Sequence, residues 1–219
     1  MMCFVAVFLA ACSDKSSEET SEYRTVYSGE IKTLNYLKTS ETNEFAVAAN
    51  LVDGLIEYDE YGVVKPSLAT EWSHNDDATV WTFKLREDAE WVTHEGKKYA
   101  DVVAQDFVDG LNYVLDGKNE SSTAWIAAVV KNGDAFYNGE VTDFSQVGIK
   151  AVDEHTLEYT LENSTPYFLS MLNYVCFFPV NGEFLAEKGT DFGTTRENFL
   201  YNGAYILDSF EPQKERVDR

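Results

Sequence analysis

Residues 80–86 read Val80-Trp81-Thr82-Phe83-Lys84-Leu85-Arg86, an alternation of apolar and polar side chains. Successive side chains of a β-strand point to opposite faces, so Trp81, Phe83 and Leu85 would share one face. The preceding residues 71–73 and the turn-rich residues 74–77 complete a hairpin. The pattern predicts a half-buried hairpin whose aromatic face, with Trp81 and Phe83, belongs to the core.

Strand signals recur on both sides of this hairpin. Residues 55–58 and 63–64 flank a turn with Gly62, and residues 148–152 and 156–161 flank a turn at 153–155. We expect further strands at residues 23–27 and 204–210, and residues 214–219 read as the start of a partner for the latter. Because the chain stops within that pairing, we expect a truncated protein.

Helical patterns lie between the strands. Residues 43–54 have helical apolar spacing, with Thr42 as the expected cap and Gly54 as the stop. Residues 106–116, 123–137 and 181–188 are expected to be helical, and Thr165-Pro166 is expected to start another helix. Strands and helices together predict an α/β protein.

Composition and charge exclude some functions. The chain is 44% hydrophobic and 14% aromatic, as in globular proteins, and 17 basic against 38 acidic residues give a net charge of −21. Phosphate neutralisation needs clustered Lys and Arg, so nucleic acid is not an expected partner. The same charge opposes electrostatic docking on anionic lipid.

The N-terminal residues predict export. Residues 1–12 form an apolar segment of roughly 18 Å as a helix, too short for a ~30 Å hydrocarbon core, and typical of a signal peptide whose start is incomplete. The segment ends in Leu9-Ala10-Ala11-Cys12, which resembles a lipobox, so Cys12 is the expected lipid attachment site; the alternative is an ordinary signal with an incidental Cys. Residues 13–22 carry no apolar side chain and predict a flexible stalk.

No sequence motif indicates catalysis or a metal site. The three histidines, His74, His94 and His155, have no helical metal-ligand spacing, and neither a Gly-x-Ser-x-Gly elbow nor a phosphate loop occurs. Cys176 lies in an apolar run and is expected to be a buried structural thiol. A catalytic carboxylate pair stays open, but no spacing singles one out.

Several blocks, in order, resemble one family. They are Asn50-Leu51-Val52-Asp53-Gly54-Leu55, Pro66-Ser67-Leu68-Ala69-Thr70-Glu71-Trp72, residues 81–91, Ala104-Gln105-Asp106-Phe107-Val108, residues 148–157 and Tyr201-Asn202-Gly203-Ala204-Tyr205. The series resembles the oligopeptide-binding lipoproteins of Gram-positive ABC importers, in family 5 of the solute-binding proteins. The resemblance covers residues 23–219.

The resemblance implies a fold. The family has a periplasmic-binding-protein-like (type II) two-lobed clamshell that encloses peptide between its lobes. Residues 23–219 would form only the first lobe, with an extra small subdomain at about residues 60–160. The second lobe would be absent, so we expect this chain alone to bind peptide weakly or not at all.

The resemblance also implies a function. The protein would capture oligopeptides outside the cell and deliver them to the permease and ATPase subunits of an ABC importer. It would be a monomer, lipid-anchored on the extracellular face of the cell membrane, with no cofactor and no catalysis. The alternatives are a relative that binds another small solute, a surface adhesin or peptide-signal sensor, and a hydrolase, which the missing nucleophile motif opposes.

Two places are carried over as peptide contacts. The segment 35–43 matches a family loop that touches peptide backbone, which nominates Ser40, Glu41 and Thr42. Trp125 lies near a family position where an aromatic side chain faces the ligand, although core packing of Trp125 is the preferred interpretation. Ordinary surface loops are the alternative for both places.

Overall fold

The structure, a computed structural model, describes residues 29–211. The predicted signal peptide, Cys12, the stalk at 13–22 and the strands at 23–27 and 214–219 lie outside the described residues and stay predictions. Within residues 29–211, no helix is both long enough and apolar enough to cross a membrane.

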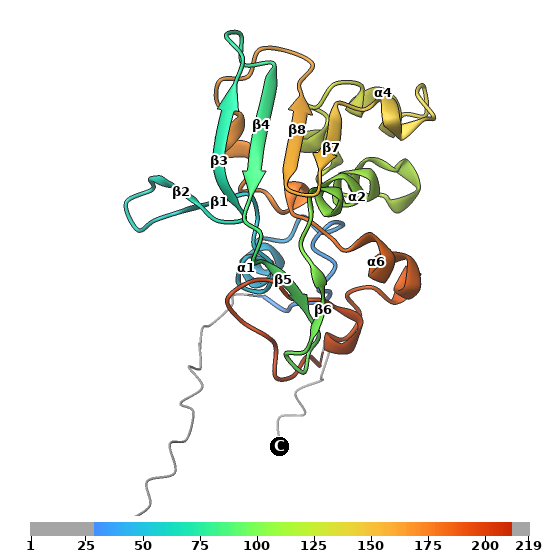
Figure 1. Ribbon diagram of the computed structural model, residues 1–219. Coiled ribbons are helices and arrows are strands. Elements are labelled where there is room, and N and C mark those ends of the chain that lie inside the picture. The colour runs from blue at the N-terminus through green and yellow to red at the C-terminus, as the bar shows by residue number, and fades with distance from the viewer. Residues whose placement is uncertain (1–28, 212–219) are drawn as a thin grey trace, which may run out of the picture.

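The chain alternates strands and helices (Figure 1). The strands are β1 (Ile56–Tyr58), β2 (Val64–Pro66), β3 (Ala69–His74), β4 (Val80–Leu85), β5 (Glu90–Val92), β6 (Lys98–Asp101), β7 (Ile149–Asp153) and β8 (Thr156–Thr160). The α-helices are α1 (Thr42–Leu51), α2 (Ala104–Leu115), α3 (Ala124–Ala127), α4 (Gly133–Tyr137), α5 (Phe168–Met171) and α6 (Gly182–Lys188). Short 3-10 turns are η1 (Gly117–Asn119), η2 (Phe144–Gln146), η3 (Val175–Phe177), η4 (Gly189–Asp191) and η5 (Arg196–Asn198).

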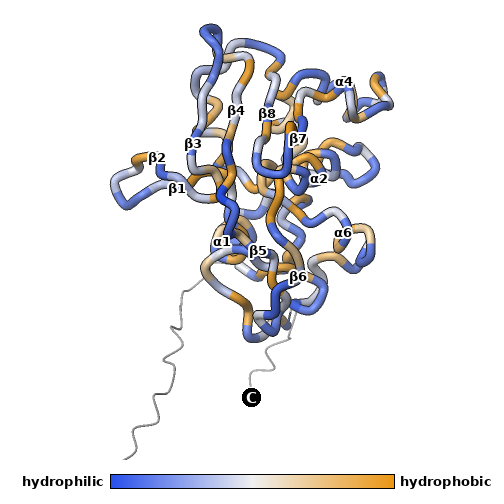
Figure 2. Tube along the Cα trace, viewed as in Figure 1, coloured by the Kyte–Doolittle hydropathy of each residue, from blue (hydrophilic) through white to orange (hydrophobic). Residues whose placement is uncertain are grey.

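The largest sheet is antiparallel, in the order β3-β4-β8-β7. Trp81 pairs with Tyr159 and Phe83 with Leu157, so the apolar faces of β4 and β8 coincide. Trp81, Phe83 and Leu85 are buried, whereas Lys84 is exposed. The predicted core face of the second hairpin is therefore confirmed, and its hydrophilic turn lies at the far tip of the sheet (Figure 2).

Rings from three parts of the chain fill the core against this sheet. Phe168 of α5 contacts both Trp81 and Tyr159, with ring centroids 5.8 and 5.2 Å apart. Phe177 of η3 adds an edge-to-face contact with Phe168 at 5.7 Å. The helix α2 packs against β7, β8 and η3, beside these rings (Figure 1).

Cys176 lies in the same core. It is fully buried, and burial raises the pKa of its thiol to about 12. The thiol therefore stays protonated near neutral pH, as an inert packing group would. The prediction of a buried thiol is confirmed.

Three predicted hairpins and two predicted helices are confirmed. The hairpins are β1–β2, β3–β4 and β7–β8, and the helices are α2 and α6. In α6 the Asn181 side chain accepts a hydrogen bond from the backbone N–H of Phe184 at 2.9 Å, and Gly189 follows the helix with φ +52°.

The predicted ends of α1 are wrong. Thr42 is the first helical residue rather than the cap, because Glu41 occupies that position without a side-chain cap bond. The helix ends at Leu51, whose carbonyl accepts from the backbone N–H groups of Asn202 and Gly203. Gly54 instead provides room, since a Cβ there would lie 2.8 Å from the Phe178 ring.

The continuous helix predicted over residues 123–137 is wrong. It is two short helices, α3 and α4, because Val130 forms a bridge with Leu161 and the Lys131 N–H donates to the Thr160 carbonyl. Pairing with the end of β8 uses backbone groups that a helix would need. Asn132 then reverses the chain with φ +57°.

The predicted helix start at Thr165-Pro166 and the predicted strand at residues 204–210 are also wrong. Thr165 does not cap a helix: its hydroxyl donates to the Asn163 carbonyl, and α5 begins later, at Phe168. Residues 204–210 form no strand, since no strand among residues 29–211 pairs with them. A strand needs a hydrogen-bonded neighbour, and apolar alternation alone does not supply one.

Candidate functional site

The two segments nominated as ligand contacts lie side by side. Ser121 Oγ donates a 2.6 Å hydrogen bond to the Leu37 carbonyl, although the two residues are 84 positions apart. The Ser122 N–H donates to the Lys38 carbonyl at 3.0 Å. These bonds join the loop before α1 to the segment that leads into α3. The two nominated places therefore lie in neighbouring segments.

The loop before α1 is fixed from beneath. Asn35 Nδ2 donates to the Tyr113 hydroxyl of α2 at 3.1 Å, and the Tyr36 hydroxyl donates to the Pro179 carbonyl at 2.5 Å. Tyr36 is buried, and burial raises the pKa of its hydroxyl well above the ordinary value. The backbone N–H of Leu34 donates to the Gly193 carbonyl at 2.9 Å. This support holds the exposed part of the loop in place.

Ser40, Glu41 and Thr42 are exposed at the start of α1. The Glu41 N–H donates to Thr39 Oγ1 at 3.0 Å, which shapes the turn into the helix. Within residues 29–211 the side chains of Ser40, Glu41 and Thr42 make no hydrogen bond or ion pair. These three side chains are therefore open to solvent.

Trp125 lies on the surface, with 77% of the residue exposed. The preferred interpretation as a core residue is therefore wrong. The other residues of α3, Ala124, Ile126 and Ala127, are buried. The buried positions of this short helix are occupied by small and aliphatic side chains, and the indole of Trp125 lies on the solvent side. Exposure of a large apolar ring to water is unfavourable, so an exposed Trp is a candidate for contact with a ligand.

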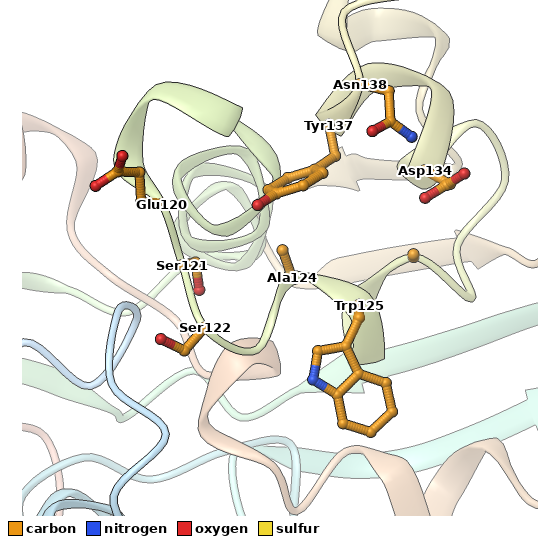
Figure 3. A pocket seen from close by; sticks show the side chains of 9 residues that line it. Glu120, Ser121, Ser122, Ala124, Trp125, Asp134, Tyr137 and Asn138 are labelled. Carbon is orange, nitrogen blue, oxygen red and sulfur yellow. The ribbon is translucent and has the colours of Figure 1, made fainter.

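Trp125 borders a hollow of about 360 Å³ (Figure 3). The residues that line it are Glu120, Ser121, Ser122, Ala124, Trp125, Ala128, Asp134, Tyr137 and Asn138. In Figure 3 the ring of Tyr137 reaches from α4 toward the Glu120–Ser121 segment. The hollow adjoins the bonds that tie Ser121 and Ser122 to the loop before α1.

Sequence reasoning missed Tyr137, Glu120 and Asp134 as members of this site. In one continuous helix Tyr137 would stand twelve residues, about 18 Å, from Trp125. The break between α3 and α4 brings both residues to one hollow. Two sequence features could have indicated the break. Asn132-Gly133 is a turn-forming pair, and Asn138-Gly139 after Tyr137 is typical of a helix end.

The described residues offer no group of three or more His, Cys, Asp or Glu that could hold a metal ion. The buried carboxylate of Asp106 serves the fold, since it accepts from Trp91 Nε1 and from the Val103 N–H. The nominated residues and those around the hollow offer hydrogen-bonding side chains and two exposed aromatic rings.

The fold is that of the periplasmic-binding-protein type II class, as two solved structures show. The substrate-binding domain of an oligopeptide ABC transporter from Bacillus anthracis superposes with a TM-score of 0.80 at 33% identity, over 86% of this chain and 35% of that one. Listeria monocytogenes OppA bound to peptide gives a TM-score of 0.75 at 32% identity, over 82% of this chain and 34% of that one. The fold class implied by the sequence is confirmed.

The sequence profile described as "Bacterial extracellular solute-binding proteins, family 5 Middle" matches residues 63–218. The chain belongs to this family, whose members are solute-binding proteins rather than enzymes. The oligopeptide-binding proteins AliB and AmiA of Streptococcus pneumoniae are 43% and 40% identical over 92% and 94% of the chain. The chain spans about a third of their length, 31% and 32%. The family resemblance read from the sequence is confirmed.

Proposed function

We propose that this chain is part of the substrate-binding component of an ABC importer and captures oligopeptides outside the cell. One observation carries the proposal: 43% identity over 202 residues to an oligopeptide-binding protein. The neighbouring segments 37–42 and 121–125 support it, because the first carries exposed polar side chains and the second an exposed indole.

The surface suits a peptide without demanding one sequence. An extended peptide presents backbone N–H and C=O groups, which Ser40, Glu41 and Thr42 can meet directly or through water. The Trp125 ring offers apolar area that many side chains can cover. Micromolar affinity requires about −8 kcal/mol, and contacts of these kinds can supply it together with a second binding surface. No catalytic step is part of the proposal.

Ligand identification tests the proposal. The protein is purified from the cells that make it, without denaturant, and its bound small molecules are identified by mass spectrometry. We expect a mixture of short peptides. A single sugar, metal chelate or other non-peptide solute in place of peptides would reject peptide capture in favour of a relative tuned to that solute.

Delivery of peptide to permease and ATPase subunits, by a monomer, is the second part of the proposal. Deletion of the gene should lower the uptake of labelled peptides. Unchanged uptake together with altered adhesion or altered peptide signalling would instead favour a surface adhesin or a sensor. Light scattering of the purified protein tests the monomer.

We also propose that Cys12 carries a lipid that holds the protein on the extracellular face of the cell membrane, after removal of the preceding residues. The Leu9-Ala10-Ala11-Cys12 sequence and the polar residues 13–22 support this. Cys12→Ala should release the protein into the medium. Continued membrane association of that variant would contradict the lipid anchor.

The small subdomain at about residues 60–160 remains part of the proposal. The sheet β3-β4-β8-β7 falls within this range, which supports a separate unit. Limited proteolysis should leave a resistant fragment with boundaries near these residues, and rapid cleavage inside the sheet would speak against it.

A further inference from the structure

Two acidic residues and no basic residue line the hollow beside Trp125. Glu120 and Asp134 line it, and neither carboxylate has a hydrogen bond or ion pair within residues 29–211. No Lys or Arg is among its lining residues. Lys38, Lys118 and Lys131 belong to flanking segments and are exposed. Two acidic residues without a hydrogen-bond or ion-pair partner among the described residues therefore lie on the lining of the hollow.

Two aromatic residues complete the lining. Trp125 is 77% exposed and Tyr137 is 36% exposed, so ring surface of both is open to solvent. Neither Trp125 Nε1 nor the Tyr137 hydroxyl has a hydrogen-bond partner among the described residues. An aromatic face attracts a cation through its quadrupole, and Trp attracts it most strongly.

In Figure 3 Glu120 and Asp134 lie on opposite sides of Tyr137. Carboxylates beside an aromatic ring favour a cationic group over the alternatives. An anionic side chain would meet two like charges, and a neutral side chain would gain only the apolar contact. Ser122 and Asn138 add hydrogen-bond acceptors that a guanidinium or ammonium group can use.

The volume of the hollow and the net charge of the protein are both compatible with a cationic side chain as the occupant. A hollow of about 360 Å³ lies within the range of small-ligand pockets, roughly 300–1,000 Å³. It is large enough for one long side chain but not for a folded partner. The net charge of −21 would also draw cationic peptides toward the protein.

We propose that this hollow is a specificity subsite that takes a Lys or Arg side chain of the bound peptide. The proposal rests on the proposed function, since it assigns one side chain of the peptide that the protein would capture. Glu120 and Asp134 supply the charge, and Trp125 and Tyr137 flank the aliphatic stem and the cationic head.

A peptide panel tests the subsite. The protein is purified from the cells that make it and dialysed free of ligand. Calorimetry then measures its affinity for alanine-based pentapeptides with one Lys, Gln or Glu at each position in turn. At one position we expect the Lys peptide to bind about tenfold tighter than its Gln counterpart, which corresponds to about 1.4 kcal/mol. The Glu peptide should bind more weakly than either.

Matched variants assign the preference to the hollow. Glu120→Gln with Asp134→Asn removes both lining charges, and the Lys preference should fall to about twofold or less. Asp76→Asn with Glu87→Gln changes the net charge equally at exposed positions outside the hollow and should keep the preference. Trp125→Leu should weaken binding of the Lys peptide more than that of the Gln peptide.

The outcomes separate the two proposals. Peptide binding with equal affinity for Lys and Gln peptides, or a Lys preference that survives Glu120→Gln with Asp134→Asn, would overturn the subsite and leave peptide capture standing. An equal loss in the Asp76 and Glu87 variant would assign the preference to overall charge and overturn the subsite as well. Absence of binding for every peptide by the full-length protein, as distinct from residues 23–219 alone, would overturn both.

Discussion

The indole Nε1 of Trp91 donates a 2.8 Å hydrogen bond to Asp106 Oδ2, and both side chains are buried. The same oxygen accepts from the Val103 N–H at 2.9 Å, so one carboxylate fixes β5 to the start of α2. Burial raises the pKa of Asp106 to about 6 from the ordinary 3.8, against the lowering effect of these two hydrogen bonds. Two tests follow from this junction.

Asp106→Ala should lower the free energy of unfolding by about 2–4 kcal/mol at pH 7. It leaves the Trp91 and Val103 donors buried without an acceptor, and it opens a small cavity. Asp106→Asn keeps an acceptor of the same shape and is the matched control, with a much smaller loss expected. Urea unfolding of the three proteins measures this, and equal losses for the two variants would show that the acceptor is not what matters.

The free energy of unfolding should depend on pH in a way that reflects the raised pKa of Asp106. Its folded pKa of about 6 lies above the unfolded value near 3.8, so between these values the folded state binds more protons. The contribution of Asp106 to the free energy of unfolding therefore falls as pH rises from about 4 to about 6. The difference between the wild type and Asp106→Asn should fall across this window and level off above pH 7. A flat difference would mean that burial does not shift this pKa.

Trp125→Ala should change stability by less than about 0.5 kcal/mol but weaken peptide binding. The side chain is 77% exposed and buries little area within the described residues, so its loss removes few contacts. Tyr61→Ala is the control, because Tyr61 is 82% exposed at the tip of the protruding β1–β2 hairpin. Calorimetry with a peptide mixture should separate the two, and equal affinity for both variants would argue against a ligand role for Trp125.

Gly193→Ala should destabilise the protein more than Gly62→Ala does. Both glycines have positive φ, +73° and +75°, so both variants carry the left-handed backbone cost of about 1–2 kcal/mol. Only at position 193 would the new Cβ meet backbone, at 2.4 Å from the Asn35 nitrogen. Position 62 has open space. Urea unfolding compares them, and similar losses would mean that the loop before α1 shifts freely.

Ser121→Ala should loosen the contact between the loop before α1 and the segment that leads into α3. It removes the donor to the buried Leu37 carbonyl and should lower the free energy of unfolding by about 1–3 kcal/mol. Ser122→Ala, an exposed neighbour whose backbone bond to Lys38 persists, should have almost no effect. Hydrogen exchange of the Ser122 amide should quicken in Ser121→Ala, and unchanged protection would show that the backbone bond alone holds the segments together.

The sequence alone determined the elements whose information is local. Alternation in residues 80–86 and 156–161 specified strands and their buried faces, because side chains of a strand alternate with a period of two whatever lies nearby. Spacing in residues 104–115 specified α2 in the same way. The ordered blocks from Asn50 to Tyr205 also indicated the family.

Contacts between distant segments set where the helices end and which side chains come together. The helix α1 ends early because distant N–H groups satisfy the Leu51 carbonyl, and residues 123–137 break because Val130 pairs with Leu161. The same break places Trp125 and Tyr137 at one hollow, and the bond from Ser121 to Leu37 joins segments 84 residues apart. Such contacts depend on backbone groups, which every residue type carries alike, so a sequence pattern does not record them.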